Sequence, residues 1–259
     1  ILTAALLGLS LNSFADNAPL WLRFSAISPD GQTIAFSYKG DIFSVPVNGG
    51  TAKQLTTNSA YDAYPVWSPD GQKIAFASTR EGSMDVYLMD KNGGVPKRLT
   101  TNSGNETPMA FTDNSHVLFT SAGMPTAKSI FFASGTFPQT YEVGIDASRP
   151  RLYSPMTMYD VSIRSNGDIL YHDAKGYEDN FRKHHRSPVT RDIWLYSKGN
   201  YTKLTDFNGE DRTPVWAGND NAYYYLSEED GTFNVYKRNI DGSGKKQLTF
   251  PKKNPVRFL

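Results

Sequence analysis

The sequence contains no cysteine, which excludes disulfide bonds, thiol catalysis and metal sites built on thiolates. It also lacks an excess of either charge, because 27 basic residues oppose 26 acidic ones. This balance gives no indication of binding to nucleic acid or to a membrane surface. After residue 11 no segment keeps an apolar period of 3.6 residues, so we expect few helices. What the chain does have is 13% aromatic residues, which favours a well-filled β core.

The first fifteen residues have the composition of an export signal. An apolar run from Ile1 to Leu11 is followed by Ser13-Phe14-Ala15, the small residues that signal peptidases require. The run is too short to cross a bilayer as a helix, although a membrane anchor and a buried helix are the alternatives. We therefore interpret 1–15 as the remnant of an export signal cleaved after Ala15, and we expect a periplasmic protein without a membrane span.

The most informative feature is an internal repeat of about forty residues. SPDGQTIAF at Ser28–Phe36 returns as SPDGQKIAF at Ser68–Phe76, and the copies continue to the NGG and LTTN words that follow each. Weaker copies begin at Thr107, Tyr159 and Thr213. The approximate boundaries of the copies are 20–58, 59–102, 103–150, 151–208 and 209–250, with 251–259 as the start of another.

The pattern of each copy predicts four short strands joined by turns. In the second copy we expect strands at 65–67, 73–78, 85–89 and 96–100. The turn residues have defined physical roles, because proline presets φ, aspartate bonds to its own backbone and glycine accepts positive φ. These predicted structural turns are Pro29, Asp30, Gly31, Pro69, Asp70 and Gly71.

The strands are apolar at consecutive positions, as in Ile74-Ala75-Phe76, which is typical of sheets covered on both faces. Blades stacked around an axis satisfy this pattern better than a two-sheet sandwich does. We therefore predict an all-β fold for 16–259, a β-propeller of four-stranded antiparallel blades. It has five complete blades plus the first strand of a sixth, as in a truncated six-bladed propeller. A closed five-bladed ring sealed by Val256–Leu259 is the alternative.

The repeated words resemble the propeller repeats of TolB-type proteins and tricorn-type peptidases. The context of the repeats separates the two, namely the segments Pro19–Thr56, Asn180–Tyr196, Glu210–Asp220 and Tyr224–Tyr236. These resemble the amino-terminal propeller of bacterial tricorn-like serine peptidases over essentially all of 20–259. The resemblance implies a non-catalytic domain that shapes peptide access, with a PDZ module and a tail-specific-protease-type catalytic domain downstream in the same chain. It also implies a peptide or protein substrate, and it leaves the formation of a homo-oligomer open.

A search for chemistry in the residues themselves finds no nucleophile elbow, zinc-protease motif, Walker loop or dinucleotide fingerprint. Asp30 and Asp70 do not form a catalytic pair, since later copies carry Asn166-Gly167 and Asn219-Asp220 at the equivalent turns. Acidic residues at 206–211 could hold Ca²⁺, but a polar loop between blades is the better interpretation. We expect no catalytic residue, cofactor or metal.

The fourth copy departs most from the repeat, because its second and third strands are joined by a long segment, and long loops often carry function. We predict that its basic cluster contacts a peptide carboxylate or an acidic neighbouring domain. The alternative is a solvated loop, or one held by Glu178 and Asp179. The candidate binding residues are Arg182, Lys183, His184, His185, Arg186 and Arg191.

Three functions remain, in this order: the access propeller of a serine peptidase, a TolB-like protein-binding propeller without enzymatic activity, and the propeller of a prolyl-oligopeptidase-type enzyme.

Overall fold

A computed structural model describes residues 21–122, 138–176, 188–218, 221–251, 255–257 and 259. These residues form twenty β-strands and no helix, so none of the described segments could cross a membrane as a helix. The strands form five antiparallel sheets of four strands each, and in each sheet the strands are neighbours in chain order. The predicted all-β class and the five blades are confirmed.

The first three blades contain β1 to β12. The first blade contains β1 (Arg23–Ile27), β2 (Thr33–Tyr38), β3 (Asp41–Pro46) and β4 (Lys53–Gln54). The second contains β5 (Asp62–Trp67), β6 (Lys73–Glu81), β7 (Ser83–Asp90) and β8 (Lys97–Arg98). The third contains β9 (Glu106–Asp113), β10 (His116–Ser121), β11 (Gln139–Gly144) and β12 (Arg151–Ser154). Strand β12 lies just beyond residue 150, where the sequence placed the approximate end of the third copy.

The last two blades contain β13 to β20. The fourth blade contains β13 (Tyr159–Ile163), β14 (Ile169–His172), β15 (Ile193–Ser197) and β16 (Asn200–Lys203). The fifth contains β17 (Asp211–Trp216), β18 (Ala222–Ser227), β19 (Asn234–Asn239) and β20 (Lys246–Gln247).

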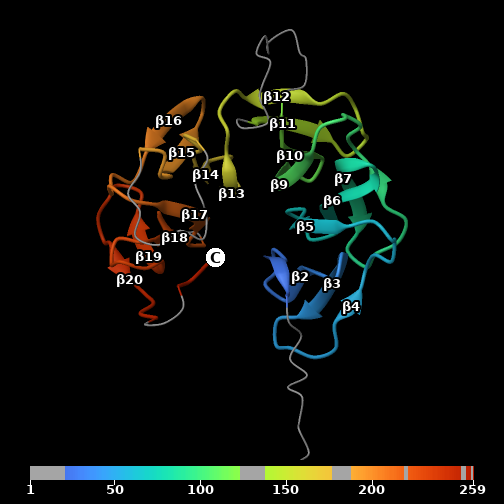
Figure 1. The fold of residues 1–259 in the computed structure, drawn as a ribbon, viewed down its shortest axis with the longest axis horizontal. Helices are drawn as coiled ribbons and strands as arrows, with labels where there is room; N and C mark the ends of the chain where they lie inside the picture. The colour runs from blue at the N-terminus through green and yellow to red at the C-terminus, as the bar shows by residue number, and fades with distance from the viewer. Residues whose placement is uncertain (1–20, 123–137, 177–187, 219–220, 252–254, 258) are drawn as a thin grey trace, which may run out of the picture.

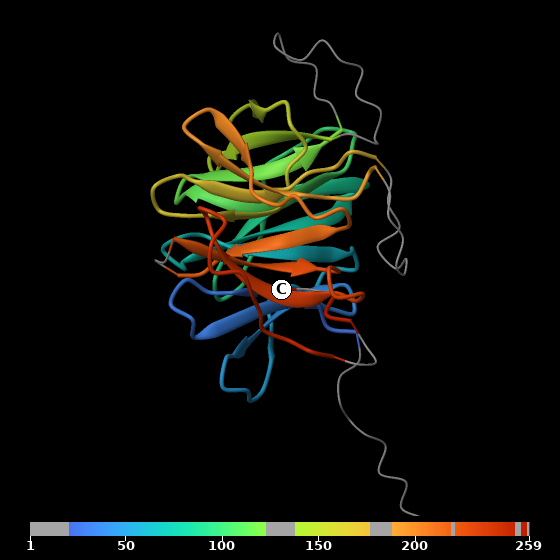
Figure 2. The ribbon, with the colours of Figure 1, turned by 90° about the vertical axis from the view of Figure 1, so that its left-hand side faces the viewer.

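The five blades are arranged in a ring around a central axis (Figure 1), and the turned view shows the sheets stacked beside one another (Figure 2). Successive blades contact each other through their first strands, in the order β1, β5, β9, β13 and β17. The first and fifth blades face each other across the open side of the ring (Figure 1).

The described residues do not form a sixth blade. The described residues 255–257 and 259 form no strand, and the backbone nitrogen of Val256 instead donates to the carbonyl of Phe233 in the fifth blade at 2.9 Å.

The hydrophobic core consists of clusters between neighbouring blades. Ala75 and Phe76 are both fully buried and adjacent in β6, yet Ala75 packs against the third blade and Phe76 against the first. Consecutive apolar residues therefore serve two different cores, which explains why these strands do not alternate between apolar and polar residues.

The repeated SPDGQ words form the turns between the first and second strands of their blades. In the first blade the hydroxyl of Ser28 and the backbone nitrogen of Gln32 donate to Asp30 Oδ1, at 2.5 and 3.0 Å. Gly31 closes the turn with φ of +70°, which a residue with a Cβ rarely adopts. The second blade repeats the arrangement with Ser68 and Asp70. Because each Asp30-type carboxylate is engaged in holding its own turn, the repeat is architectural.

Candidate functional site

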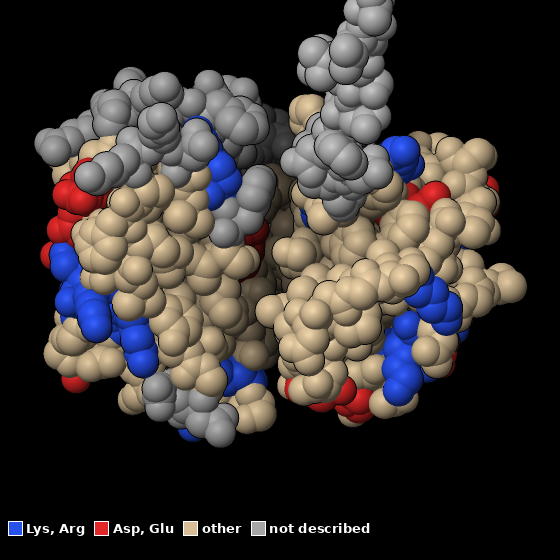
Figure 3. Space-filling view, turned by 90° about the horizontal axis from the view of Figure 1, so that it is seen from below, with Lys and Arg blue, Asp and Glu red and all other residues tan. Residues whose placement is uncertain are grey.

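A cavity of about 1520 Å³ lies along the axis of the ring. Its lining includes residues from the first strand of every blade, and it extends to the side of the first blade that faces the fifth. The space-filling view shows the hollow between the two sides of the ring (Figure 3). A concave space lined by all five blades is a candidate site for a ligand.

A repeated backbone irregularity shapes the wall of this axial cavity. The pairing of the first and second strands shifts register in each blade, as β-bulges do. In four blades a non-glycine residue at the bulge has positive φ, and all four such residues line the cavity: Phe24, Tyr64, Asp160 and Thr213. A bulge increases the local twist and redirects side chains, so the repeat places an equivalent side chain in the cavity in four of the five blades.

The wall formed by the first three blades is mainly apolar. The rings of Phe24 and Tyr64 lie 3.9 Å apart between centroids, and burial raises the pKa of the Tyr64 hydroxyl above its usual range. Pro108 and Met109 continue this wall in the third blade. Apolar side chains of a ligand would lose water on this side of the cavity.

The fourth and fifth blades contribute polar groups instead. Thr213 donates its hydroxyl to Asp160 at 2.9 Å, and its backbone nitrogen lies 3.3 Å from His172 Nδ1. The imidazole also stacks on the ring of Tyr159, with centroids 5.7 Å apart. Burial lowers the pKa of His172 to about 4, although the nearby Asp160 carboxylate acts in the opposite direction. His172 is therefore neutral near pH 7, and its Nδ1 accepts the Thr213 N–H rather than forming an ion pair with Asp160, 3.6 Å away.

Two arginines lie next to this polar group. Arg191 donates to Glu210 Oε1 at 2.5 Å, and the guanidinium of Arg212 lies 3.6 Å from the same oxygen. Burial lowers the pKa of Arg212 from its usual range, and its guanidinium also covers the ring of Phe233 at 4.2 Å. Both arginines line the cavity, so its two sides differ: one is apolar and the other carries charged groups.

The basic cluster predicted from the sequence is only partly described. Arg191 lies at the cavity, whereas Arg182, Lys183, His184, His185 and Arg186 lie outside the described residues.

One long connection, in the fourth copy, stands out in the sequence. In the third blade the connection between β10 and β11, residues 122–138, is also long compared with the tight turn between β6 and β7. His172, Asp160 and Arg212 were missed as site residues. They lie at or beside the bulges of their blades, which no local sequence pattern marks.

The described residues offer means of binding rather than a metal centre. Within the described ranges no group of three or more His, Asp or Glu side chains could hold a metal ion. The groups at the axial cavity offer a ligand apolar contact on one side, and hydrogen bonds and charge on the other.

Comparisons with known proteins agree with this architecture. Residues 19–259 match the family described as the tricorn protease N-terminal beta propeller domain. Tricorn protease homolog 1 of Streptomyces coelicolor is 28% identical over 236 residues, which cover 90% of this chain and 21% of the relative. Dipeptidyl-peptidase 5 of Porphyromonas gingivalis is 43% identical over 106 residues, covering 37% of this chain and 16% of that protein. The chain thus spans roughly a fifth of the length of these relatives.

Solved structures show the same fold at low sequence identity. The tricorn protease crystal structure matches with a TM-score of 0.71 and 20% identity, covering 89% of this chain and 22% of that one. A putative TolB from Agrobacterium tumefaciens matches with a TM-score of 0.66 and 16% identity, covering 88% of this chain and 80% of that one. The family match over nearly the whole sequence, together with five four-stranded blades around an axial cavity, shows that this chain belongs to the family of tricorn protease N-terminal β-propeller domains.

Proposed function

We propose that this chain is the non-catalytic propeller of an exported tricorn-like serine peptidase, and that its axial cavity shapes the access of peptides to downstream PDZ and protease domains. The observation that carries the proposal is the cavity of about 1520 Å³ in a chain of this family. The small share of the relatives' length that the chain covers supports the presence of further domains.

The test narrows the cavity in the full-length protein. Ser25 is exposed and lines the cavity, so Ser25→Trp inserts an indole without removing a core contact. Ser103→Trp places the same ring on an exposed site that does not line the cavity. We expect kcat/KM for peptides of about fifteen residues to fall several-fold in Ser25→Trp, with little change for a tripeptide reporter or in Ser103→Trp. Equal rates for both peptides in both variants would remove the access role.

A TolB-like binding propeller without enzymatic activity is the second candidate, because the chain covers 80% of the putative TolB structure. The two functions differ in the full-length protein: the peptidase hydrolyses peptides, whereas the binding propeller retains a partner protein and hydrolyses none.

We also propose that a sixth blade follows Leu259 and covers the face of the first blade. On this face the rings of Phe36 and Tyr38 lie 5.9 and 5.8 Å from that of Phe43, and all three line the cavity. Hydrogen exchange provides the test. The amides of β2 and β3 should exchange faster in a protein ending at residue 259 than in one extended by about forty residues, the length of one repeat. Identical exchange would contradict the proposal.

For the basic segment we propose contact with a peptide carboxylate or with an acidic neighbouring domain. The position of Arg191 at the cavity supports this. Glutamine at Arg182, Lys183 and Arg186 should weaken peptide binding or domain assembly. A charge-matched control places glutamine at the exposed residues Arg149, Lys198 and Lys246. If peptide affinity and assembly are the same in both, the proposal fails.

Export is a separate proposal, which rests on residues 1–15 outside the described ranges. Amino-terminal sequencing of the mature protein should find Asp16 as the first residue, and recovery of an intact Ile1–Ala15 segment would contradict cleavage.

A further inference from the structure

Two tryptophans occupy equivalent places in different blades. Trp67 ends β5 and donates its indole N–H to the carbonyl of Ala26 in the preceding blade, at 3.1 Å. Trp216 ends β17 and donates to the carbonyl of Ser162 in its preceding blade, at 3.0 Å. The same bond at the same strand end anchors both indoles to the neighbouring blade.

Of these two indoles, only that of Trp216 is covered by a cation from the described residues. The guanidinium of Arg164, from the fourth blade, lies 3.7 Å from the centroid of the Trp216 ring. It is held there by Asp168 and by Asn221, each with an oxygen 3.4 Å from Nη2. Trp216 is consequently buried, with 8% of its surface exposed.

In the first blade the position of Arg164 is taken by a serine. The equivalence follows from the turn hydrogen bonds, since Ser28 N donates to Thr33 O at 2.8 Å just as Arg164 N donates to Asp168 O at 3.0 Å. Gln72 similarly corresponds to Asn221, because each carbonyl accepts the backbone nitrogen that follows the third strand. The residues that hold a guanidinium between the fourth and fifth blades thus have positional counterparts between the first and second, where Thr33 stands in place of Asp168 and no guanidinium is present.

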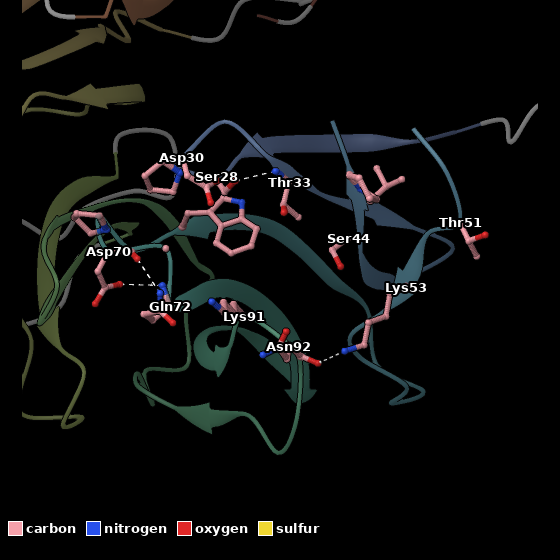
Figure 4. A pocket seen from close by; sticks show the side chains of 16 residues that line it. Ser28, Asp30, Thr33, Ser44, Thr51, Lys53, Asp70, Gln72, Lys91 and Asn92 are labelled. Carbon is pink, nitrogen blue, oxygen red and sulfur yellow. Dashed lines mark hydrogen bonds between the residues drawn. The ribbon is translucent and has the colours of Figure 1, made fainter. Parts of the chain in front are cut away.

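A cavity of about 690 Å³ lies at this second place. Its lining includes Ser28, the counterpart of Arg164, together with Thr33, Trp67 and Gln72, the counterparts of the residues around the Arg164 guanidinium. We call it the turn pocket, because it lies between the SPDGQ turns of the first two blades (Figure 4).

Two carboxylates stand at this pocket. Asp30 and Asp70 both line it, and the hydroxyls of Ser28 and Ser68, respectively, hold the pKa of each carboxyl below its usual range. Both are ionised at neutral pH. The positive charges of two lysines, Lys53 and Lys91, balance the two negative charges. Lys53 donates to the carbonyl of Asn92 at 2.9 Å, and Lys91 lies nearer the centre of the view (Figure 4). With the charges balanced, the ring of Trp67 provides the selectivity, and a planar guanidinium stacks on such a ring better than an ammonium does.

We propose that the turn pocket binds the guanidinium of an arginine side chain from a peptide or partner protein, stacked on Trp67 as Arg164 is stacked on Trp216. This site is separate from the axial cavity and does not depend on the proposed access role.

The test measures binding of acetyl-Gly-Arg-Gly-amide to the full-length protein by ligand-observed NMR titration. The citrulline peptide has the same shape without the charge, and the lysine peptide has the charge without the planar group. We expect the arginine peptide to bind about 2- to 30-fold more tightly than the citrulline peptide, with the lysine peptide between them. Equal affinity for arginine and citrulline peptides would overturn the proposal.

Three variants locate the binding. Ser28→Arg supplies the pocket with its own guanidinium and should abolish binding. Trp67→Phe should also weaken binding, and it remains informative if Ser28→Arg does not fold. Phenylalanine is chosen because Phe111 occupies the equivalent register position in the third blade. The double change Asp30→Asn, Asp70→Asn should also weaken it, and the turns should persist because Asn166 Oδ1 accepts the same kind of backbone bond, at 3.0 Å. Unchanged affinity in these variants would contradict the assigned location.

The axial-cavity variant Ser25→Trp distinguishes arginine binding in the turn pocket from the proposed access role. Ser25→Trp should leave binding of the arginine peptide unchanged, and Ser28→Arg should leave the hydrolysis of long peptides unchanged. Loss of arginine binding in Ser25→Trp alone would place the ligand in the axial cavity and overturn the proposal.

Discussion

The Nδ1 atom of His172 lies 3.3 Å from the backbone nitrogen of Thr213, and this contact joins the fourth blade to the fifth. Since burial lowers the pKa of His172 to about 4, from 6.5 in the unfolded chain, the folded protein binds fewer protons than the unfolded chain between these values. The free energy of unfolding should therefore decrease as the pH falls from about 6.5 to 4.

His172→Asn isolates this effect, because the amide oxygen can accept the Thr213 N–H but does not titrate. Between pH 7 and pH 4 the wild type should lose about 3 kcal/mol relative to the variant, measured by urea unfolding across the pH range. His116→Asn removes a partly exposed imidazole instead and serves as the control. Parallel stability curves for wild type and His172→Asn would contradict the prediction.

A buried carboxyl group gives the opposite pH dependence. Asp211 is 2% exposed and its Oδ1 has no hydrogen-bond partner among the described residues. Burial raises the pKa of Asp211 to about 7, so the folded protein retains a proton that the unfolded chain releases near pH 4. Stability from this group is present at low pH and is lost as the pH rises toward 7. Asp211→Asn should gain up to about 4 kcal/mol over the wild type between pH 4 and pH 8.

The control for this variant is Asp206→Asn, an exposed aspartate in the same connection between blades. Its unfolding free energy should follow that of the wild type over the same pH range. Thermal unfolding at pH 5 and pH 8 provides the measurement, and an Asp211→Asn curve that tracks the wild type at both values would refute the assignment.

Substitution of two glycines at equivalent turns distinguishes the cost of backbone strain from the cost of a close contact. Gly49 and Gly93 have φ of +85° and +88°, and each donates its N–H to a carbonyl three residues earlier, at 2.9 Å. A Cβ at Gly49 would meet nothing within 4 Å, whereas one at Gly93 would lie 2.8 Å from the Leu55 carbonyl of the first blade. Gly49→Ala should cost about 1 kcal/mol, the penalty for positive φ.

Gly93→Ala should cost at least about 1 kcal/mol more, because the backbone of Leu55 must also move. Chemical denaturation of both variants measures the difference. Equal losses of unfolding free energy in the two variants would show that the Leu55 backbone moves away without a measurable loss of stability.

The sequence predicts the blades because their turns use residues with narrow conformational preferences. Asp30 and Gly31 recur as Asp70 and Gly71, and each pair forms the turn that its residue types favour. Consecutive apolar residues such as Ala75 and Phe76 likewise revealed strands covered on both faces.

The wall of the axial cavity could not be predicted in the same way. Phe24, Tyr64, Asp160 and Thr213 share a backbone conformation but no residue type. Positive φ at such residues is imposed by the register shift of the first strand rather than by their own preference, so no local pattern marks it. The open pocket at Trp67 likewise depends on which residue the preceding blade supplies. The aligned repeats place Ser28 opposite Arg164, but only the fold shows that the Arg164 guanidinium covers the ring of Trp216.

The threonine of the repeated Leu-Thr word should stabilise the start of the third strand in four of the five blades. Thr100 Oγ1 accepts the backbone N–H of Val86 at 2.9 Å, and Thr56, Thr205 and Thr249 make the same bond in their own blades. Thr100→Val keeps the shape of the side chain but leaves a buried N–H without its acceptor, which should cost about 1–3 kcal/mol. Thr100→Ser should recover most of this loss because it restores the hydroxyl. Thr101→Val makes the same change at the exposed neighbour and should alter the urea midpoint little, so equal losses at both positions would show that the hydroxyl of Thr100 has no special role.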